Sequence, residues 1–410
     1  MLLSVLLPFA LAHFISYLYR NVNTVVYPDL VRDVGLDASG LGLLTGIYMA
    51  TFALAQLPVG MALDRYGPRR VQLPMLAVAA LGGFLFAQAE TFTSLLVARG
   101  LIGLGVSASL MAAIKASSLW LPAQRLPLAT SVLLAVGGLG AAASTAPMQW
   151  AVEAVGWRWG FVGIACGALA VALLIGITVP EHSHRPPPAR LGAMVLSVAQ
   201  LYATPLFWRM ALCTVVANGA YMAIQGLWLG PWLRDVGGLS RSAAAGVLFW
   251  STVGMVLGSL TWGTLADRLQ RHRVRTVTVC GTGLLMFALC QGLMLLPQTH
   301  TTATLLAVAF CFFGTAGALN YAIVAQTMPM QLTGRVSTSF NLLIFLTGFA
   351  LQWGLGAVIN RWPADHGAYP VEAYQTALRA CLLAQLPGML LWLGFKPWQL
   401  ATATASKGHT

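Results

Sequence analysis

The sequence predicts an all-α polytopic membrane protein with twelve transmembrane helices in two pseudo-symmetric six-helix bundles. The prediction rests on composition, on twelve apolar windows and on an internal repeat. Of the 410 residues, 58% are hydrophobic and only 8% are charged, and the mean hydropathy is +0.76. A soluble chain carries roughly 25% charged residues, because its surface must be wetted. This composition therefore excludes a soluble globular protein.

Twelve segments are long and apolar enough to cross a bilayer, which takes about 20 residues. They lie at approximately 4–27, 40–62, 72–90, 93–119, 127–149, 158–179, 207–230, 243–265, 276–296, 302–327, 336–360 and 373–395. The first could be a cleaved signal peptide, with Ala10-Leu11-Ala12 as the cleavage site. No basic residue precedes that site, and the apolar run continues through Tyr27. We therefore interpret the segment as the first membrane helix.

The loop charges indicate the orientation of the chain. With the N-terminus inside, the cytoplasmic loops and tail hold Arg65, Arg69, Arg70, Arg125, Arg185, Arg190, Arg209, Arg268, Arg271, Arg273, Arg275, Arg335, Lys396 and Lys407. The outer loops hold only Arg32, Arg158, Arg234, Arg241 and Arg361. We therefore expect a multi-pass protein of a bacterial inner membrane with both termini in the cytoplasm. The net charge of +12 then reflects topology and does not predict nucleic-acid binding.

The two halves of the chain repeat each other. Three features recur about 203 residues apart: Pro28 and Pro231, Gly35-Leu36 and Gly238-Leu239, Asp64-Arg65 and Asp267-Arg268. A parallel duplication of six helices explains this spacing. We expect an N-terminal six-helix bundle over 1–180, a cytoplasmic linker over 181–206, a C-terminal six-helix bundle over 207–396 and a cytoplasmic tail over 397–410.

Metal and disulfide chemistry find little support. The six cysteines lie in apolar stretches without a CxxC pair: Cys166, Cys213, Cys280, Cys290, Cys311 and Cys381. His182 and His184 form a His-x-His in the linker, but no third ligand is near them, so a solvated linker fits better than a metal site. We expect no cofactor and no metal.

The loops resemble those of the major facilitator superfamily, and the resemblance covers essentially the whole chain. Gly60 to Arg70 matches that family's signature loop between helices 2 and 3, and Gly263 to Arg273 repeats it more weakly between helices 8 and 9. Arg99-Gly100-x-x-Gly103-x-Gly105 matches its helix-4 signature. The resemblance implies a secondary transporter of twelve helices, working by alternating access.

In that family the signature loop latches the cytoplasmic side while the protein is open outward. The resemblance assigns this gating role to Asp64, Arg65, Arg69, Arg99, Asp267 and Arg268. A carboxylate and several guanidinium groups at a helix end can form a charge-assisted cluster between neighbouring helices. Topology alone would explain the arginines but not Asp64, so the residues themselves favour a latch.

Arg20 is the main candidate for a substrate-binding group. Ionisable side chains inside a membrane are costly and therefore mark functional sites. At helical spacing, one polar stripe runs along the first helix: His13, Ser16, Tyr17, Arg20, Asn23 and Thr24. Lipid cannot satisfy such a stripe, so it must face protein or a watery cavity. A structural Arg20 bound to backbone carbonyls is the alternative.

The segment from Tyr17 to Arg20, with Pro28 eight residues later, resembles helix 1 of the anion:cation symporters and organophosphate exchangers. There the matching arginine binds the anionic group of the substrate, and a guanidinium suits a carboxylate or phosphate. The symporters usually carry Asp where this chain has Tyr19. The exchangers add an arginine in helix 7, near Met222 here, where no charge is present. A monoanion is therefore favoured over a doubly charged phosphate ester.

Neutral polar residues complete the expected site. The helices that line the cavity in this superfamily contribute Tyr17, Asn23, Asn218, Tyr221, Gln225, Trp228, Asn320, Tyr321 and Gln326. In helix 11, Asn341 and Gln352 are better explained as contacts between helices. Lys115 is either a cavity cation on the anion path or a side chain snorkelling to the cytoplasmic interface.

His13 is the candidate for proton coupling. All eleven carboxylates fall in loops or at helix ends, so no acid lies mid-membrane. His13 is the titratable group of the stripe whose ordinary pKa lies near neutrality. A histidine on a helix face is more often a hydrogen-bonded structural residue, and exchange or uniport stays open.

We therefore expect a secondary active transporter for a small organic anion or zwitterion, functioning as a monomer in the bilayer. A proton-driven drug or metabolite exporter is one alternative, although it would need an embedded acid. A copper importer is another, using Cys280, Met286, Cys290, Cys311, Met328 and Met330 as soft ligands. A membrane sensor would need an output domain, and an intramembrane enzyme clustered catalytic groups. Neither pattern is present.

Overall fold

The computed structural model describes residues 2–121, 126–181, 202–203, 205–321, 323, 330–365 and 368–393. Apart from a bridge between Asp365 and Ala368, the regular structure of these residues is helical. The all-α prediction is thus confirmed. The linker expected over 181–206 lies almost wholly outside the described residues, as do the tail, His182, His184, Gln326 and Met328.

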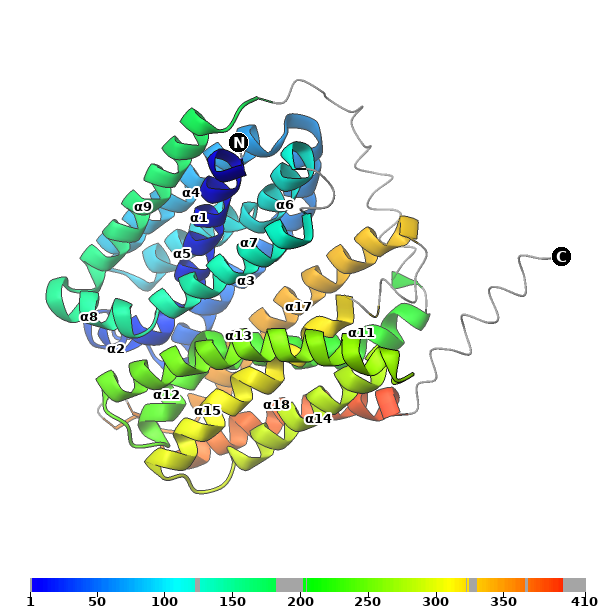
Figure 1. Cartoon of the computed structure of the whole chain (residues 1–410). Helices are drawn as coiled ribbons and strands as arrows, with labels where there is room; N and C mark the ends of the chain where they lie inside the picture. The colour runs from blue at the N-terminus through cyan, green and yellow to red at the C-terminus, as the bar shows by residue number, and fades with distance from the viewer. Residues whose placement is uncertain are drawn as a thin grey trace.

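The helices before residue 181 lie together in one group, and those after residue 205 lie together in another (Figure 1). The first helix group comprises α1 (Leu2–Asn21), α2 (Asn23–Val34), α3 (Ala38–Tyr66), α4 (Pro68–Gln88), α5 (Phe92–Val106), α6 (Ser109–Trp120), α7 (Leu126–Ala143), α8 (Ala146–Val155) and α9 (Trp157–Thr178). The second helix group comprises α11 (Pro205–Ala223), the π-helix η2 (Ile224–Trp228), α12 (Leu229–Asp235), α13 (Arg241–Arg271), α14 (Thr276–Leu293), α15 (His300–Gly314), the 3-10 helix η3 (Thr315–Ala318), α17 (Met330–Ile359) and α18 (Val371–Leu393).

Among the described residues, nine helices are long and apolar enough to span a membrane. The count reaches ten if the bent pair formed by α7 and α8 is one span. The windows expected at 4–27 and 373–395 correspond to α1 and α18, which are not among these ten. The chain is therefore a multi-pass membrane protein, and the count of twelve spans stays a prediction.

Several expected spans are interrupted where polar side chains bind backbone carbonyls. The first breaks at Val22, between α1 and α2. Between α7 and α8, Ser144 and Thr145 donate to the carbonyls of Ala141 and Ala142, both at 2.6 Å. Side chains that bond a preceding turn in this way bend helices. The interruptions were not visible in the hydropathy windows, which count apolar residues only.

The two groups meet along a seam between α3 and α17. Small residues on both helices let the backbones approach closely, as is common between membrane helices. A Cβ on Gly42 would lie 2.6 Å from the carbonyl oxygen of Gln352. A Cβ on Gly46 would lie 2.8 Å from the Phe349 ring, and one on Gly356 would collide with the Ala38 carbonyl. The seam also includes the stacked rings of Phe52 and Phe345, whose centres are 4.4 Å apart.

We predict that Gly42→Val opens this seam, because the atom its side chain would meet belongs to the backbone and cannot turn aside. Overpacking of this kind costs about 1–3 kcal/mol. The measurement is the maleimide reactivity of a cysteine introduced by Ala245→Cys, a position 3% exposed between the groups. Reactivity should rise in Gly42→Val. The matched control is Gly163→Val, since no atom lies within 4 Å of a Cβ there; equal reactivity in both backgrounds would contradict the role of the seam.

Candidate functional site

Arg20 lies at the centre of the molecule, where the two groups meet. Its guanidinium carbon lies over three aromatic rings, 4.6 Å from the centre of Tyr17, 5.5 Å from Phe52 and 5.0 Å from Phe345. Phe345 belongs to the second helix group. Arg20 is partly exposed, and its Nε is buried without a hydrogen-bond partner. Among the described residues, which include all eleven carboxylates, Arg20 takes part in no ion pair.

A second arginine fixes the backbone that carries Arg20. Arg99 on α5 is fully buried and donates from Nη1 to the carbonyl of Tyr19 at 2.7 Å, and from Nη2 to that of Arg20 at 3.2 Å. Its guanidinium carbon lies 4.9 Å from the Tyr48 ring centre. These bonds take up carbonyls that α1 leaves free at its break, at Val22. Arg99, grouped by the resemblance with the gating residues of the signature loop, thus bonds to the backbone of α1.

The polar stripe of the first helix is divided between two environments. Tyr17 and Arg20 are partly exposed, whereas His13, Ser16, Asn23 and Thr24 are buried. The Asn23 amide donates to Thr45 Oγ1 at 3.0 Å, within the first group. The Thr24 hydroxyl donates to the Gly226 carbonyl at 2.8 Å, across the interface and into the π-helix. Asn23 and Thr24 therefore hold helices together in this conformation.

His13 lies one turn from Tyr17, the rings meeting edge to face at 5.0 Å. It is only 2% exposed, and neither ring nitrogen has a hydrogen-bond partner. Across from it is α7, where a Cβ on Gly137 would lie 2.8 Å from the imidazole. A buried structural histidine normally has a hydrogen-bond partner. His13 has none, so it does not fit the alternative of a hydrogen-bonded structural residue.

The candidates on α11 and η2, the expected helix 7, lie in different surroundings. Asn218 donates to the Thr214 carbonyl at 2.7 Å, and Gln225 is half-buried in the π-helix η2. Tyr221 has a buried hydroxyl without a hydrogen-bond partner, and its ring packs against those of Phe310 and Phe287, with centroids 5.9 and 6.2 Å away. Trp228 is 3% exposed and donates to the Gln352 carbonyl at 2.9 Å, so it belongs to the closed end.

Asn320, just after η3 in the expected helix 10, is 1% exposed, and neither the oxygen nor the nitrogen of its amide group has a hydrogen-bond partner. The neighbouring Tyr321 hydroxyl donates to Asn341 Oδ1 at 3.3 Å. π-helices such as η2 often occur at functional sites.

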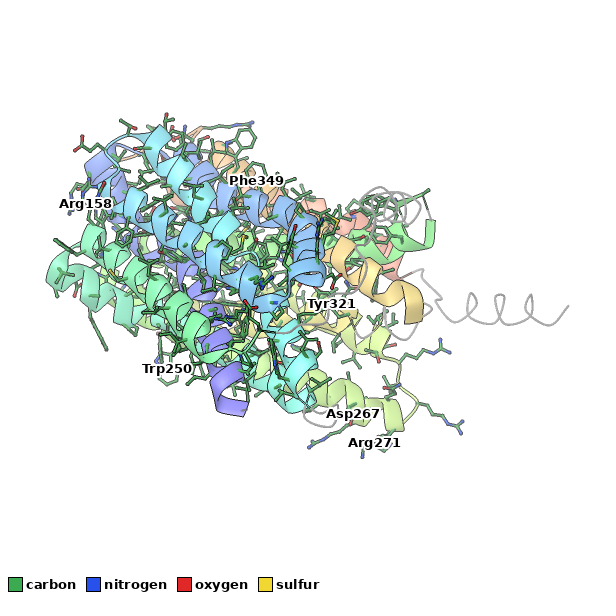
Figure 2. All side chains as sticks on the ribbon, turned by 90° about the horizontal axis from the view of Figure 1, so that it is seen from above. Arg158, Trp250, Asp267, Arg271, Tyr321 and Phe349 are labelled. Carbon is green, nitrogen blue, oxygen red and sulfur yellow. The ribbon has the colours of Figure 1, made fainter. Side chains whose placement is uncertain are left out.

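The Asp64 end of the molecule carries the signature loops. Asp64 pairs with Lys115 Nζ at 2.8 Å, so Lys115 is engaged by the loop and not by the Arg20 site. Arg65 lies over the Tyr66 ring, and Arg69 donates to the Gly176 carbonyl at the end of α9. In the second loop, Asp267 pairs with Arg271 at 3.1 Å, and Arg268 is exposed. Figure 2 shows Asp267 and Arg271 at the opposite end of the molecule from Arg158.

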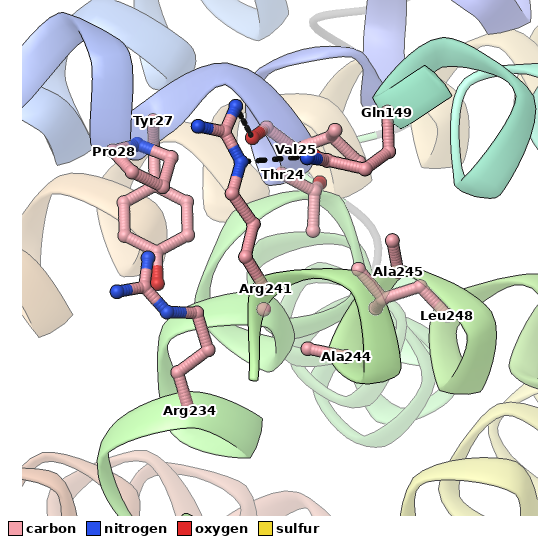
Figure 3. A pocket seen from close by; sticks show the side chains of 11 residues that line it. Thr24, Val25, Tyr27, Pro28, Gln149, Arg234, Arg241, Ala244, Ala245 and Leu248 are labelled. Carbon is pink, nitrogen blue, oxygen red and sulfur yellow. Dashed lines mark hydrogen bonds between the residues drawn. The ribbon is translucent and has the colours of Figure 1, made fainter. Parts of the chain in front are cut away.

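The Asp29 end is held closed by polar contacts between the groups that sequence reasoning missed. Arg241, the first residue of α13, pairs with Asp29 of α2 and donates to Gln149 Oε1 at 3.0 Å. Figure 3 shows Arg241 reaching towards Gln149 and Val25, with Arg234 beside the Tyr27 ring. The loop charges had assigned Arg234 and Arg241 to the outer loops, without a partner. A pairing between residues 212 positions apart leaves no signal in one sequence.

A second polar cluster closes the same end. Asp37 accepts a hydrogen bond from the Asn360 amide at 2.9 Å, and the Tyr369 hydroxyl accepts one from the backbone of Ala38 at 3.0 Å. The cross-group hydrogen bonds of the described residues thus lie at the Asp29 end, together with the bond from Thr24 to Gly226. Two groups of membrane-spanning helices, joined at one end by polar contacts, form the scaffold of a membrane transporter.

The chain belongs to the Major Facilitator Superfamily, whose sequence profile it matches over residues 9–351. It is 25% identical over 370 residues to a probable sulfoacetate transporter of Cupriavidus necator, covering 85% of this chain and 84% of that protein. It is 21% identical over 387 residues to a probable galactarate/D-glucarate transporter of Escherichia coli, covering 86% of each. The family prediction is confirmed, and the protein is a secondary transporter and not an enzyme.

The fold agrees with solved transporters. The crystal structure of a bacterial homologue of the human lysosomal transporter Spinster, in an inward-facing and occupied conformation, superposes with a TM-score of 0.75. The two sequences are 18% identical, and the match covers 95% of each chain. At this identity the likeness concerns the fold alone.

We predict that Arg241→Gln destabilises the closed conformation by about 1–2 kcal/mol. Breaking a buried pair costs about 3–5 kcal/mol, but Arg241 is partly exposed and Arg32 still lies 3.2 Å from Asp29. The measurement is the thermal unfolding midpoint, followed through thiol labelling of the buried cysteines. The control Arg361→Gln removes an exposed arginine at the same end and should leave the midpoint unchanged. A double variant with Asp29→Asn should lose less than the sum of the two single variants; strict additivity would contradict the pairing.

Proposed function

We propose that the protein carries a small organic anion across the inner membrane by alternating access, as a monomer, with Arg20 binding the anionic group. The observation that carries the proposal is the unpaired, partly exposed guanidinium between the two helix groups. A cation in low-dielectric surroundings favours a counter-ion strongly. The names of the two relatives support an anionic cargo, since sulfoacetate, galactarate and glucarate are all organic acids.

The charge of the site favours a single anionic group on the substrate. Arg20 is the central cation, Arg99 is fully buried against backbone carbonyls, and Lys115 is paired with Asp64. The helix-7 position that would carry a second arginine, near Met222, is uncharged. Tyr17, Tyr221, Asn218, Asn320 and Gln225 provide neutral donors and acceptors for the rest of a small polar molecule. Both relatives' named cargoes carry two acidic groups, so we expect this chain to differ from them in preferring a monoanion.

The conformation is open towards the cytoplasm in this proposal. The loop charges place the Asp64 end inside, so the closed Asp29 end faces outward. Opening outward requires the contacts of Arg241, Asp37 and Thr24 to part. Asp64, now paired with Lys115, is then free to form the latch with Arg65 and Arg69, and Asp267 with Arg268 acts likewise in the second half. Lys115 therefore serves gating in our proposal, not substrate binding.

His13 is retained as the proton-coupling candidate, because its buried ring nitrogens have no partner and it contacts Tyr17 directly. The drug-exporter alternative would need an acid embedded in the membrane, and the sequence places the eleven carboxylates at the ends of the expected spans and in loops. The copper alternative rests on Cys and Met side chains, of which Met328 lies outside the described residues; among the described residues, no three His, Cys, Asp or Glu side chains are grouped so that they could hold a metal.

We predict that Arg20→Ala abolishes transport while the protein still inserts into the membrane. The guanidinium would be lost without disturbing the Arg99 bonds, which go to backbone carbonyls. The measurement is a thermal-shift screen with glycolate, sulfoacetate and D-glucarate, followed by uptake of the stabilising anion into vesicles. Binding stabilises the folded protein in proportion to the logarithm of ligand concentration over Kd.

Glycolate should stabilise the wild-type chain most, and the shift should vanish in Arg20→Ala. Arg361→Ala, an exposed arginine outside the site, serves as the matched control and should keep the shift. Near-normal uptake by Arg20→Ala, or stabilisation of the wild-type chain by none of the three anions, would contradict the proposed function. A larger shift with the two diacids than with glycolate would overturn the preference for a monoanion.

A further inference from the structure

Phe345 contacts Arg20 from the opposite helix group. It lies on α17 and is 4% exposed, with its ring centre 5.0 Å from the guanidinium carbon. The ring is stacked on Phe52 of α3 at 4.4 Å with an interplanar angle of 17°. Sequence reasoning had assigned no role to either phenylalanine. The stack of Phe345 on Phe52 thus joins the α3–α17 seam to Arg20.

The three rings take the place of a counter-ion for Arg20. The face of an aromatic ring is negative, so it attracts a cation without neutralising it. Tyr17, Phe52 and Phe345 all present a ring to this guanidinium within 5.5 Å, whereas the described carboxylates form their ion pairs elsewhere. A guanidinium is weakly hydrated and stacks readily on such rings. The group is thereby oriented and partly desolvated, while its charge stays available to an anion.

We propose that Phe345 is a positioning residue for the substrate: it holds the Arg20 guanidinium ready for the anion and so sets the affinity of the site. The inference rests on the proposed role of Arg20. A preorganised and desolvated cation binds an anion more tightly than a mobile, hydrated one, because the ordering and desolvation have already taken place.

The origin of Phe345 in the second group gives the contact a consequence for transport. When the α3–α17 seam parts, the stacked rings of Phe52 and Phe345 must separate, and Arg20 then loses one of its three rings. The site therefore binds the anion more tightly in the conformation described here than in the one open at the Asp29 end. Release towards that end is aided by the same movement that opens it.

The competing explanation is that Phe345 only fills space in the seam. Phe349, one turn along the same helix and labelled in Figure 2, provides the matched comparison. It too packs in the seam, against Gly46, and it stacks on Trp353 at 6.3 Å. No cation–π contact of the described residues involves its ring. A packing role predicts similar effects for the two phenylalanines, whereas positioning predicts an effect on binding for Phe345 alone.

The experiment compares Phe345→Leu, Phe345→Tyr and Phe349→Leu as full-length protein in detergent. For each variant, Kd is measured for glycolate, sulfoacetate and D-glucarate, and the unfolding midpoint is measured without ligand. We expect Phe345→Leu to raise Kd for the bound anion about 3- to 30-fold, the loss of one cation–π contact. Phe345→Tyr keeps an aromatic ring at this position and should leave Kd close to that of the wild-type chain. Phe349→Leu should lower the midpoint as Phe345→Leu does, and leave Kd unchanged.

Equal changes in Kd for Phe345→Leu and Phe349→Leu would overturn the inference, as would an unchanged Kd in Phe345→Leu or a Kd raised as much in Phe345→Tyr as in Phe345→Leu. Arg20→Ala separates this result from the proposed function. If Arg20→Ala loses the anion and Phe345→Leu keeps it, only the positioning role fails. If Arg20→Ala still binds the anion, the proposed function fails first.

Discussion

The structure depends on one unneutralised charge, the guanidinium of Arg20, placed where two helix groups meet. A charge within a membrane protein is costly unless its surroundings stabilise it. Here three aromatic rings lie around the guanidinium, and the buried Arg99 fixes the backbone that carries it. Neither contact neutralises the charge. In the proposed function, an anion completes this site, to which residues of both groups contribute.

The two helix groups approach each other closely next to Arg20. Glycines on α3 and α17 allow backbone contact along a seam that includes Phe52 and Phe345, beside Arg20. Beyond the seam, Arg241 and Asp37 add polar contacts between the groups. Glycines at the contact points let the helix backbones approach closely along this interface. Directional polar bonds then specify which arrangement is closed.

In the proposed transport cycle, the carboxylates at the two ends exchange their partners as one end closes and the other opens. At the closed end Asp29 and Asp37 bridge the groups, whereas at the other end Asp64 bonds to Lys115 within its own group. An exposed pair such as Asp64 with Lys115 contributes little stability, so exchanging it for another partner costs little. The π-helix η2 lies between the ends, and its Gly226 carbonyl accepts the Thr24 hydroxyl across the interface. The π-helix η2 is therefore coupled directly to α2.

The sequence by itself determined the membrane class, the all-α fold and the family, and it singled out Arg20 as a candidate, because hydropathy, loop charge and an isolated ion in an apolar span are local properties. It could not assign Arg99 to the carbonyls of helix 1, divide the polar stripe into open and buried faces, or pair Lys115 with Asp64. It also missed Arg241 with Asp29 and the rings of Phe52 and Phe345. Only the tertiary structure decided these, since each depends on which faces of distant helices meet, and the approach of two helix backbones leaves no pattern along a single chain.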